Sequence, residues 1–223
     1  MISDENGKNS LSLPTKGRVL IKAAKIYDAV QPFVTLGQEA KLNSFIAAYF
    51  SEGKKLRILD IGCGTGQLTS NIALKNPGIH ITGIDASLPM IQVAERKRAI
   101  DKRCTFMQAL GEDIPFEDAF FDAAVSSLFF HHVNRSLKLK SLLEIFRVLK
   151  PGGKLLIADM DKPYSTAGKI LSYSAWILLR QPEIKENIDG LIRILLEEAG
   201  FRNIRQISRF SGYITVTEAI KTE

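Results

Sequence analysis

Short apolar runs alternate with amphipathic stretches through the middle of the chain. Apolar runs bounded by charge or glycine are typical of buried parallel strands, and they lie at 56–61, 80–85, 104–108, 121–126 and 154–159. Apolar positions at three- and four-residue steps predict helices between them, over 66–75, 87–100 and 137–149. Strands and helices that alternate at this spacing predict right-handed β-α-β units and a parallel sheet covered on both faces.

The two ends of the chain follow other patterns. A helical pattern over 16–50 is broken at Pro32 and Gly37. The pattern of the last third predicts two helices, at 167–180 and 183–199, followed by two closing strands, at 203–209 and 213–220. The prediction is therefore an α/β fold with a mostly parallel seven-stranded sheet, helices on both faces and a C-terminal antiparallel strand pair.

Composition narrows the class of protein without indicating a function. The 223 residues are 45% hydrophobic and 24% charged, which suits one compact domain and excludes a disordered or fibrous chain. A net charge of +6 permits an acidic partner but does not require one. Two cysteines, Cys63 and Cys104, are too few for a disulfide framework. Because residues 1–10 are polar and no apolar stretch reaches the ~20 residues of a spanning helix, we expect a cytoplasmic protein.

The sharpest motif is Asp60-Ile61-Gly62-Cys63-Gly64-Thr65-Gly66, at the end of the first predicted strand. Alternate glycines allow a tight turn and a close approach to a ligand, at the edge where open α/β sheets bind ligands. No lysine follows Gly66, as a phosphate-binding loop requires, and the spacing departs from the dinucleotide pattern Gly-x-Gly-x-x-Gly. The acidic Asp60 disfavours a pyrophosphate and suits a cation, which indicates a sulfonium-bearing nucleoside.

A second acid, Asp85, ends the next predicted strand, 19 residues after Gly66. A carboxylate at this position can accept hydrogen bonds from both hydroxyls of a ribose. A single aspartate at a strand end is weak evidence, but its spacing from the glycine loop strengthens the prediction of a nucleoside site.

Six stretches of the chain carry one combined resemblance. They are 58–66, Gly83-Ile84-Asp85-Ala86-Ser87 with Met90, Glu112-Asp113-Ile114-Pro115-Phe116, Phe121-Asp122, Leu128-Phe129-Phe130-His131-His132-Val133 and Arg147-Val148-Leu149-Lys150-Pro151-Gly152-Gly153. In this order they resemble the class I S-adenosylmethionine-dependent methyltransferases, in particular the small-molecule group that includes the ubiquinone/menaquinone C-methyltransferases. Leu196-Glu197-Glu198-Ala199-Gly200-Phe201 extends the resemblance toward the C-terminus.

This resemblance implies a Rossmann-like fold and one methyltransferase domain over 1–223. Its parts would be an N-terminal helical cover (1–50), a cofactor-binding core (54–160), and a helical insertion with closing strands (161–223). The implied cofactor is S-adenosyl-L-methionine, with S-adenosyl-L-homocysteine as product. The implied reaction is methyl transfer to carbon or oxygen of a small, hydrophobic acceptor.

The resemblance also implies cofactor contacts. The methionine part would lie along the glycine loop beside Asp60, the ribose on Asp85 and the sulfonium near Leu128. The implied cofactor residues are Asp60, Gly62, Cys63, Gly64, Gly66, Asp85, Ala86, Ser87, Met90, Gly111, Glu112 and Leu128. The family often has Asp or Asn at the position of Leu110, so here Glu112, Asp113, or apolar and backbone groups would hold the adenine.

The candidate catalytic residues are His131, His132 and Tyr27. The histidines follow the fourth predicted strand, and histidine is the side chain whose ordinary pKa lies nearest neutrality, which suits a general base. Helix capping or packing is the alternative role for each. Asp159 and Asp161, after the fifth strand, would orient an acceptor or lie in an exposed loop. By resemblance Tyr27 would help to close the site, and packing on the core is its alternative.

The partner we expect is a small-molecule methyl acceptor. Segment 170–179, with Tyr173 and Trp176, is apolar nearly all round, so we expect it to be buried against its own domain or a second subunit in a homodimer. Roofing a lipophilic pocket and peripheral contact with a membrane are the alternatives.

Other functions are less well supported by the sequence. The basic clusters lack interleaved aromatic residues and no Asn/Asp-Pro-Pro-Tyr element occurs, which disfavours nucleic acid as a partner. No cluster of His, Cys and carboxylates has metal-ligand spacing. Two alternatives remain open: a cofactor-binding regulatory or partner module without its own acceptor, and a nucleic-acid or protein methyltransferase.

Overall fold

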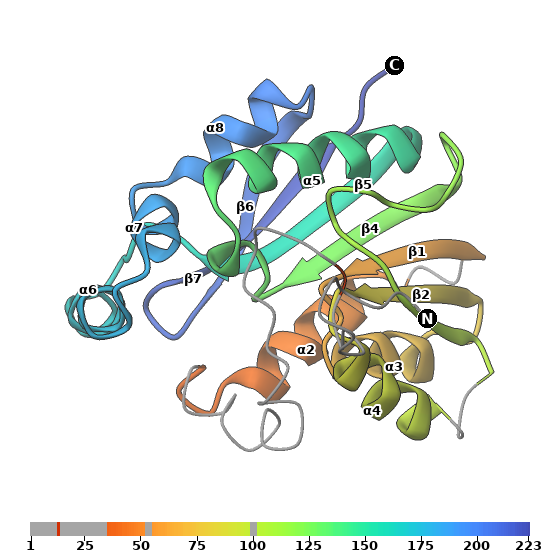
Figure 1. Cartoon of the computed structure of the whole chain (residues 1–223), viewed down its shortest axis with the longest axis horizontal. Coiled ribbons are helices and arrows are strands. Elements are labelled where there is room, and N and C mark those ends of the chain that lie inside the picture. Colours follow the sequence, from red (N-terminus) through yellow and green to blue (C-terminus); the bar gives the residue numbers. More distant parts are fainter. Residues whose placement is uncertain (1–12, 14–34, 52–54, 99–101) are drawn as a thin grey trace, which may run out of the picture.

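A seven-stranded sheet forms the centre of the molecule (Figure 1). The structure, a computed structural model, describes residues 13, 35–51, 55–98 and 102–223. The strand order is β3-β2-β1-β4-β5-β7-β6, and β7 runs antiparallel to both of its neighbours, β5 and β6. The strands are β1 (Leu56–Ile61), β2 (Ile79–Asp85), β3 (Cys104–Gln108), β4 (Phe121–Ser127), β5 (Leu149–Met160), β6 (Arg202–Phe210) and β7 (Ile214–Ile220). The predicted Rossmann-like α/β fold with a C-terminal antiparallel pair is confirmed.

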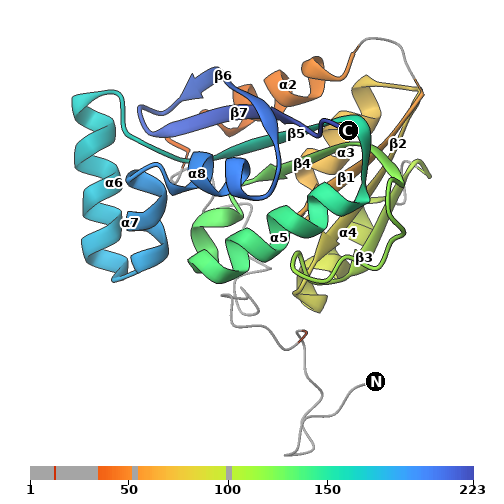
Figure 2. The ribbon, with the colours of Figure 1, turned by 90° about the horizontal axis from the view of Figure 1, so that it is seen from above.

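Helices cover both faces of this sheet (Figures 1 and 2). On one face lie α2 (Glu39–Tyr49), α3 (Gln67–Lys75) and α4 (Leu88–Arg98), and on the other lie α5 (Arg135–Val148) and α8 (Leu191–Glu198). Each face has its own hydrophobic cluster. Ile72 of α3 and Ile91 of α4 belong to the first, and Ile145 of α5 and Leu195 of α8 to the second.

The parallel register brings the carboxyl ends of three central strands to one edge. Asp60 of β1 lies opposite Gly83 of β2 and Val125 of β4. The segments that follow these strands therefore start side by side, which is where the predicted site residues lie.

The predicted helix over 183–199 is wrong in one respect, because it consists of two helices. The first is α7 (Pro182–Ile188) and the second is α8, which begins at Leu191. Gly190 between them has a φ of +85°, a left-handed conformation that ends the first helix and turns the chain.

Segment 170–179 is buried against its own domain along only part of its surface, and burial against a second subunit stays a prediction. This segment belongs to α6 (Thr166–Leu179), which stands with α7 at one end of the molecule (Figure 2). Gly168 and Ser172 lie on its buried side, whereas Ile170, Ile177 and Leu178 are 64%, 66% and 81% exposed. A single helix at the end of a sheet contacts the body along one stripe, so its remaining apolar residues face solvent.

None of the described helices combines the length and the apolar content needed to cross a bilayer. The division into a cover (1–50), a core (54–160) and an insertion with closing strands (161–223) stays a prediction.

Candidate functional site

The glycine loop joins β1 to α3 in a tight turn. The backbone N–H groups of Gly62 and Cys63 donate to the carbonyl of Ile84 in β2, at 2.9 and 3.0 Å. Gly62, Gly64 and Gly66 have φ of +70°, +53° and +74°, all in the left-handed region that favours glycine. The loop is therefore anchored to β2 and turns where its sequence predicts.

The structure gives a further reason for two of these glycines. A Cβ atom on Gly62 would lie 2.6 Å from the ring of Phe129, and one on Gly66 would lie 2.6 Å from the ring of Phe106. The lack of a side chain at both positions therefore lets aromatic rings of the same chain pack against the loop.

Gly62→Ala is expected to lower the free energy of unfolding by about 2 to 3 kcal/mol, through left-handed strain and the clash with Phe129 together. Gly152→Ala is the matched control, because Gly152 has a φ of +76° with nothing within 4 Å of a Cβ atom. It should cost only the conformational part, about 1 kcal/mol. Urea unfolding measures both, and equal losses would contradict the packing role of Gly62.

Asp85 joins this loop to the start of α4. Its Oδ2 accepts the N–H of Gly64 at 3.0 Å, and its Oδ1 accepts the N–H of Ser87 at 2.8 Å. Burial raises the pKa of Asp85 above its usual range, although these two N–H groups act against the rise. Each carboxylate oxygen can accept a further hydrogen bond, so the group has capacity for a pair of hydroxyls.

Asp60 lies beneath the loop and is almost completely buried. The hydroxyl of Thr69 in α3 donates to its Oδ2 at 2.5 Å. Burial raises the pKa of Asp60 to about 7 despite this bond, and the nearby charge of Asp85 adds to the rise. The ionised form of Asp60 is thus disfavoured until a positive charge comes near.

These two acids lie close together, and the charge of Asp85 acts to raise the pKa of Asp60. Among the residues that the structure describes, neither Asp60 nor Asp85 forms a salt bridge. A positively charged ligand beside the loop would stabilise both carboxylates. The donor set therefore fits a nucleoside that carries a ribose and a cationic sulfur or amino group.

A small pocket of about 30 Å³ opens beside the loop. Its lining residues are Glu39, Asn43, Asp60, Gly62, Cys63, Gly64, Thr65, Gln67, Leu68 and Ser127. Glu39 and Asn43 are not predicted from the sequence, because they come from α2 and lie far from the loop along the chain. Gln67 and Ser127 are not predicted either, although Ser127 is the last residue of β4 and its position at a strand end is a usable signal.

The predicted adenine end is built mainly from backbone and apolar groups. The carbonyl of Ala86 accepts Nε2 of Gln108 at 2.9 Å, and Met90 is 2% exposed. Glu112 is half-buried in the turn between Leu110 and Asp113, which form an isolated bridge. A contact of Glu112 with adenine stays a prediction.

Gly111 is buried in the same turn. A Cβ atom there would meet Oγ of Ser141 at 3.1 Å and the ring of Phe129 at 3.2 Å. Phe129 therefore lies against both Gly62 and Gly111 and links the glycine loop to the predicted adenine end.

Leu128 and the histidines follow β4. Leu128 has a φ of +56°, unusual for a residue with a side chain, and its N–H donates to the carbonyl of Ala158 in β5 at 2.8 Å. The short 3₁₀ helix η1 (Phe130–His132) comes next. The strained turn at Leu128 directs the chain from β4 across the end of β5.

His131 forms a buried pair with Asp159. Its Nδ1 lies 2.7 Å from Oδ1 of Asp159, and the two side chains are 8% and 2% exposed. Asp159 also accepts the N–H groups of Phe130 and Met160, each at 2.7 Å, and Nδ2 of Asn187 lies 3.4 Å away. Although burial acts to raise it, the charge of His131 and these hydrogen bonds hold the pKa of Asp159 below its usual range.

The other candidates take different places. The ring of His132 lies 3.9 Å from that of His131, centroid to centroid. Asp161 is half-buried beyond β5 and its N–H donates to the carbonyl of Tyr213. Tyr27 lies outside the described residues.

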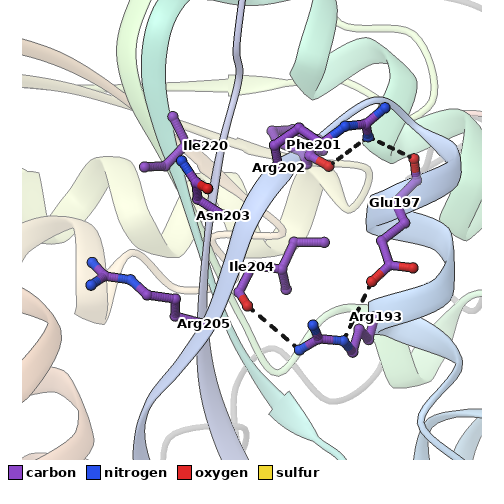
Figure 3. Close-up of a pocket in the computed structure, with 8 residues that line it drawn as sticks. All are labelled: Arg193, Glu197, Phe201, Arg202, Asn203, Ile204, Arg205 and Ile220. Carbon is purple, nitrogen blue, oxygen red and sulfur yellow. Dashed lines mark hydrogen bonds and ion pairs between the residues drawn. The ribbon is translucent and has the colours of Figure 1, made fainter.

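A larger groove of about 950 Å³ lies away from this edge, between α8 and β6 (Figure 3). Two arginines that line it are engaged by neighbouring groups of the chain. Arg193 forms an ion pair with Glu197 at 3.4 Å, and Arg202 donates a hydrogen bond to the carbonyl of Phe201 at 2.9 Å. Neither Asp60 nor Asp85 lines this groove, so it is not the site that the sequence predicts for a nucleoside.

Metal ligands do not gather at the site. In the part of the chain that the structure describes, no group of three or more His, Cys, Asp or Glu residues could hold an ion.

Comparison with known proteins agrees with this geometry. A family model described as "Methyltransferase domain" matches residues 59–157. The chain is 30% identical to the ubiquinone/menaquinone biosynthesis C-methyltransferase UbiE of Vibrio campbellii over 187 residues. This alignment covers 74% of this chain and 71% of that protein. The chain is 41% identical over 107 residues to a demethylmenaquinone methyltransferase of Clavibacter sepedonicus, spanning 48% of this chain and 42% of that protein.

A solved structure has the same fold. Phosphoethanolamine N-methyltransferase 2 of Haemonchus contortus, in complex with S-adenosyl-L-methionine, superposes with a TM-score of 0.67 at 19% identity, over 90% of this chain and 56% of that longer chain. Together with the sequence matches, this confirms the family resemblance read from the motifs. The chain belongs to the class I S-adenosylmethionine-dependent methyltransferases, among those that act on small molecules.

Proposed function

We propose that this methyltransferase transfers the methyl group to a carbon or oxygen atom of a small hydrophobic acceptor. S-adenosylmethionine supplies an electrophilic methyl group on a positively charged sulfur. During transfer the sulfur–methyl bond breaks, a methyl bond to the acceptor forms, and the acceptor gives up one proton. The protein must therefore bind a cation, align the acceptor, exclude water and receive that proton.

Asp60 and Asp85 support the cofactor half of this proposal. The unused hydrogen-bonding capacity of Asp85 suits the two ribose hydroxyls, since its oxygens already accept Gly64 and Ser87 from the other side. Asp60, buried among the loop residues and in no salt bridge with any residue that the structure describes, would face the positively charged end of the cofactor.

The acceptor half rests on one observation, the buried contact between His131 and Asp159. The low pKa of Asp159 keeps its carboxylate ionised, and an ionised carboxylate can only accept hydrogen bonds. Nδ1 of His131 is therefore the donor in this contact, and in a neutral imidazole Nε2 is then the nitrogen with a free lone pair. A histidine oriented in this way by a carboxylate is suited to act as a general base.

Buried apolar residues adjoin that pair along the chain. Leu128, Phe130 and Met160 are near it in sequence, at the carboxyl ends of β4 and β5. An acceptor site at these strand ends would be apolar, which suits a hydrophobic ring that carries one acidic hydroxyl. The names of the relatives, a C-methyltransferase of quinone biosynthesis and a demethylmenaquinone methyltransferase, support the same kind of acceptor.

The test is to incubate the full chain with S-adenosylmethionine labelled in its methyl group and with a cell extract. We expect label in a small molecule that partitions into organic solvent, with the methyl on carbon or oxygen as identified by mass spectrometry. His131→Gln should bind the cofactor normally and transfer the methyl more slowly. Label found only in RNA or protein would favour a macromolecular substrate, and cofactor binding without any transfer would favour a partner module.

The affinity for S-adenosylmethionine is expected to rise about fivefold between pH 6 and pH 7. Because the pKa of Asp60 is about 7 in the free protein, its ionised fraction grows from about one tenth to about one half over this range. Only the ionised form attracts the cation, so binding strengthens as the pH rises. Calorimetric titration at fixed ionic strength measures the profile.

Two variants separate Asp60 from other titrating groups. Asp60→Asn should flatten the profile. Thr69→Val removes a hydrogen bond that lowers the pKa of Asp60, so it should move the rise to higher pH. A profile that survives unchanged in Asp60→Asn would assign the pH dependence to another residue.

A further inference from the structure

We propose that α6 is a docking helix for the surface of an anionic phospholipid bilayer. Its exposed apolar residues form what we call the docking face, made of Ile170, Leu171, Tyr173, Ile177 and Leu178, which are 64%, 37%, 38%, 66% and 81% exposed. Ile170, Tyr173 and Ile177 recur at three- and four-residue steps and share one side of the helix. Gly168 and Ser172 occupy the opposite, buried side.

The charges around the docking face have one sign. Between Asp161 and Glu183 the charged residues are Lys162, Lys169 and Arg180, and all three are exposed cations. An apolar helix flanked by cations and without acids complements lipid tails and anionic headgroups at once.

The acids of the neighbouring α7, and Asp189 directly after it, do not cancel this charge. Glu186 pairs with the buried Lys138 at 2.6 Å, and Asp189 pairs with Lys185 at 2.5 Å. Glu183 is half-buried. The positive charge next to the docking face therefore remains available to a negatively charged surface.

Aromatic residues at the side of the docking face fit the same environment. Nζ of Lys185 lies 6.0 Å from the ring of Tyr173 and 5.7 Å from the ring of Trp176. Tyrosine and tryptophan beside a cation are typical of the boundary between lipid headgroups and tails.

A second copy of this chain fits the docking face less well. Two α6 helices paired antiparallel through this face would bring Lys169 of one copy toward Arg180 of the other. No acidic residue in the segment would neutralise these like charges. The same charges favour an anionic bilayer, and this selects the bilayer over a homodimer.

The position of α6 makes docking geometrically simple. The helix stands at one end of the molecule, beyond the edge of the sheet and clear of α2, α3 and α4 (Figures 1 and 2). Nζ of Lys138 in α5 holds α7, through the carbonyl of Glu183 at 3.1 Å, and α7 lies between α6 and η1. A bilayer under α6 would thus lie on the side of the candidate acceptor site. This inference does not depend on the proposed function.

The test uses the full chain without cofactor or acceptor. Vesicles of phosphatidylcholine alone are compared with vesicles containing a third of phosphatidylglycerol, by co-sedimentation. We expect binding to the anionic vesicles at least about tenfold stronger than to the neutral ones and weakened by salt. Trp176 is the chain's single tryptophan, so a blue shift of its fluorescence reports directly that α6 enters the lipid.

Matched variants locate the binding surface. The double variant I170S/I177S should lower binding to anionic vesicles about tenfold or more. I194S makes the same change at an isoleucine of α8 that is 55% exposed, and it should bind like the wild type. Thermal unfolding checks that both variants are folded.

Three results would overturn the proposal. They are no binding of the wild type to anionic vesicles, equal binding by I170S/I177S and the wild type, or a dimer in light scattering that I170S/I177S abolishes. The last would assign the docking face to a second copy of the chain. Because no methyl transfer is measured, failure here leaves the proposed reaction unaffected, and failure of the reaction leaves docking unaffected.

Discussion

Replacing Asp85 by alanine is expected to weaken the binding of S-adenosylhomocysteine about 100-fold. The ionised carboxylate would lose its hydrogen bonds to the ribose hydroxyls, each worth about 1.5 to 3 kcal/mol when one partner is charged. It would also lose the bonds that tie Gly64 to Ser87, so the loop would be less well ordered before the ligand arrives. S-adenosylhomocysteine is a suitable probe because it carries the same ribose without the sulfonium charge, and measuring both proteins at one pH keeps the ionisation of Asp60 out of the comparison.

Asp122→Ala is the matched control for this experiment. Like Asp85, Asp122 lies on a central strand and its carboxylate accepts a backbone N–H. The donor is the N–H of Arg57, at 2.7 Å. Asp122 lies at the start of β4, at the opposite end of the strand from the glycine-loop side, so its loss should leave ligand affinity unchanged. If folded Asp85→Ala bound the ligand within about threefold of wild type, the ribose assignment would be wrong.

The glycine loop and the two acids could be predicted because their physical requirements are local. A glycine in a left-handed conformation and a carboxylate at a strand end leave a signal within a few residues. What could not be predicted is why Gly62 and Gly66 tolerate no side chain. Their neighbours, Phe129 and Phe106, come from distant parts of the chain and meet the loop only in the folded sheet.

The pairing of His131 with Asp159 could not be predicted from the sequence either, because the two residues meet only in the folded sheet. Each residue could be proposed as a candidate from its position after a strand, but 28 residues separate them. Only the parallel contact of β4 with β5 brings the two strand ends together. Similarly, Glu39 and Asn43 reach the glycine-loop pocket because α2 packs there, which no local pattern in α2 indicates.

The split of the predicted 183–199 helix and the exposure of α6 have different causes. The break at Gly190 was visible as a glycine, but the apolar periodicity on both sides favoured one continuous helix. The exposure of α6 contradicts a rule that normally holds, because an apolar helix is usually covered by its own protein. Where that rule fails, the surface usually contacts something else, and the inference about α6 follows from this exception.

The largest loss of stability is expected from Asp159→Ala, which should lower the free energy of unfolding by about 3 to 5 kcal/mol at pH 7. The carboxylate is buried and accepts from His131 and from the N–H groups of Phe130 and Met160. Its removal leaves these donors in a space that water enters poorly. Asp161→Ala, two residues further along at a half-buried position, should change stability by less than about 0.5 kcal/mol.

The pH dependence distinguishes loss of this charge from a simple loss of packing. Because the pKa of Asp159 is lower in the folded state than in the unfolded chain, its charge stabilises the fold above about pH 4. That contribution is lost as the pH falls through the folded-state pKa. The gap between wild type and Asp159→Ala in urea unfolding should therefore narrow below about pH 4. A gap of constant size at pH 7 and pH 3 would mean that Asp159 acts through its volume, and the orienting role given to its charge beside His131 would fall with it.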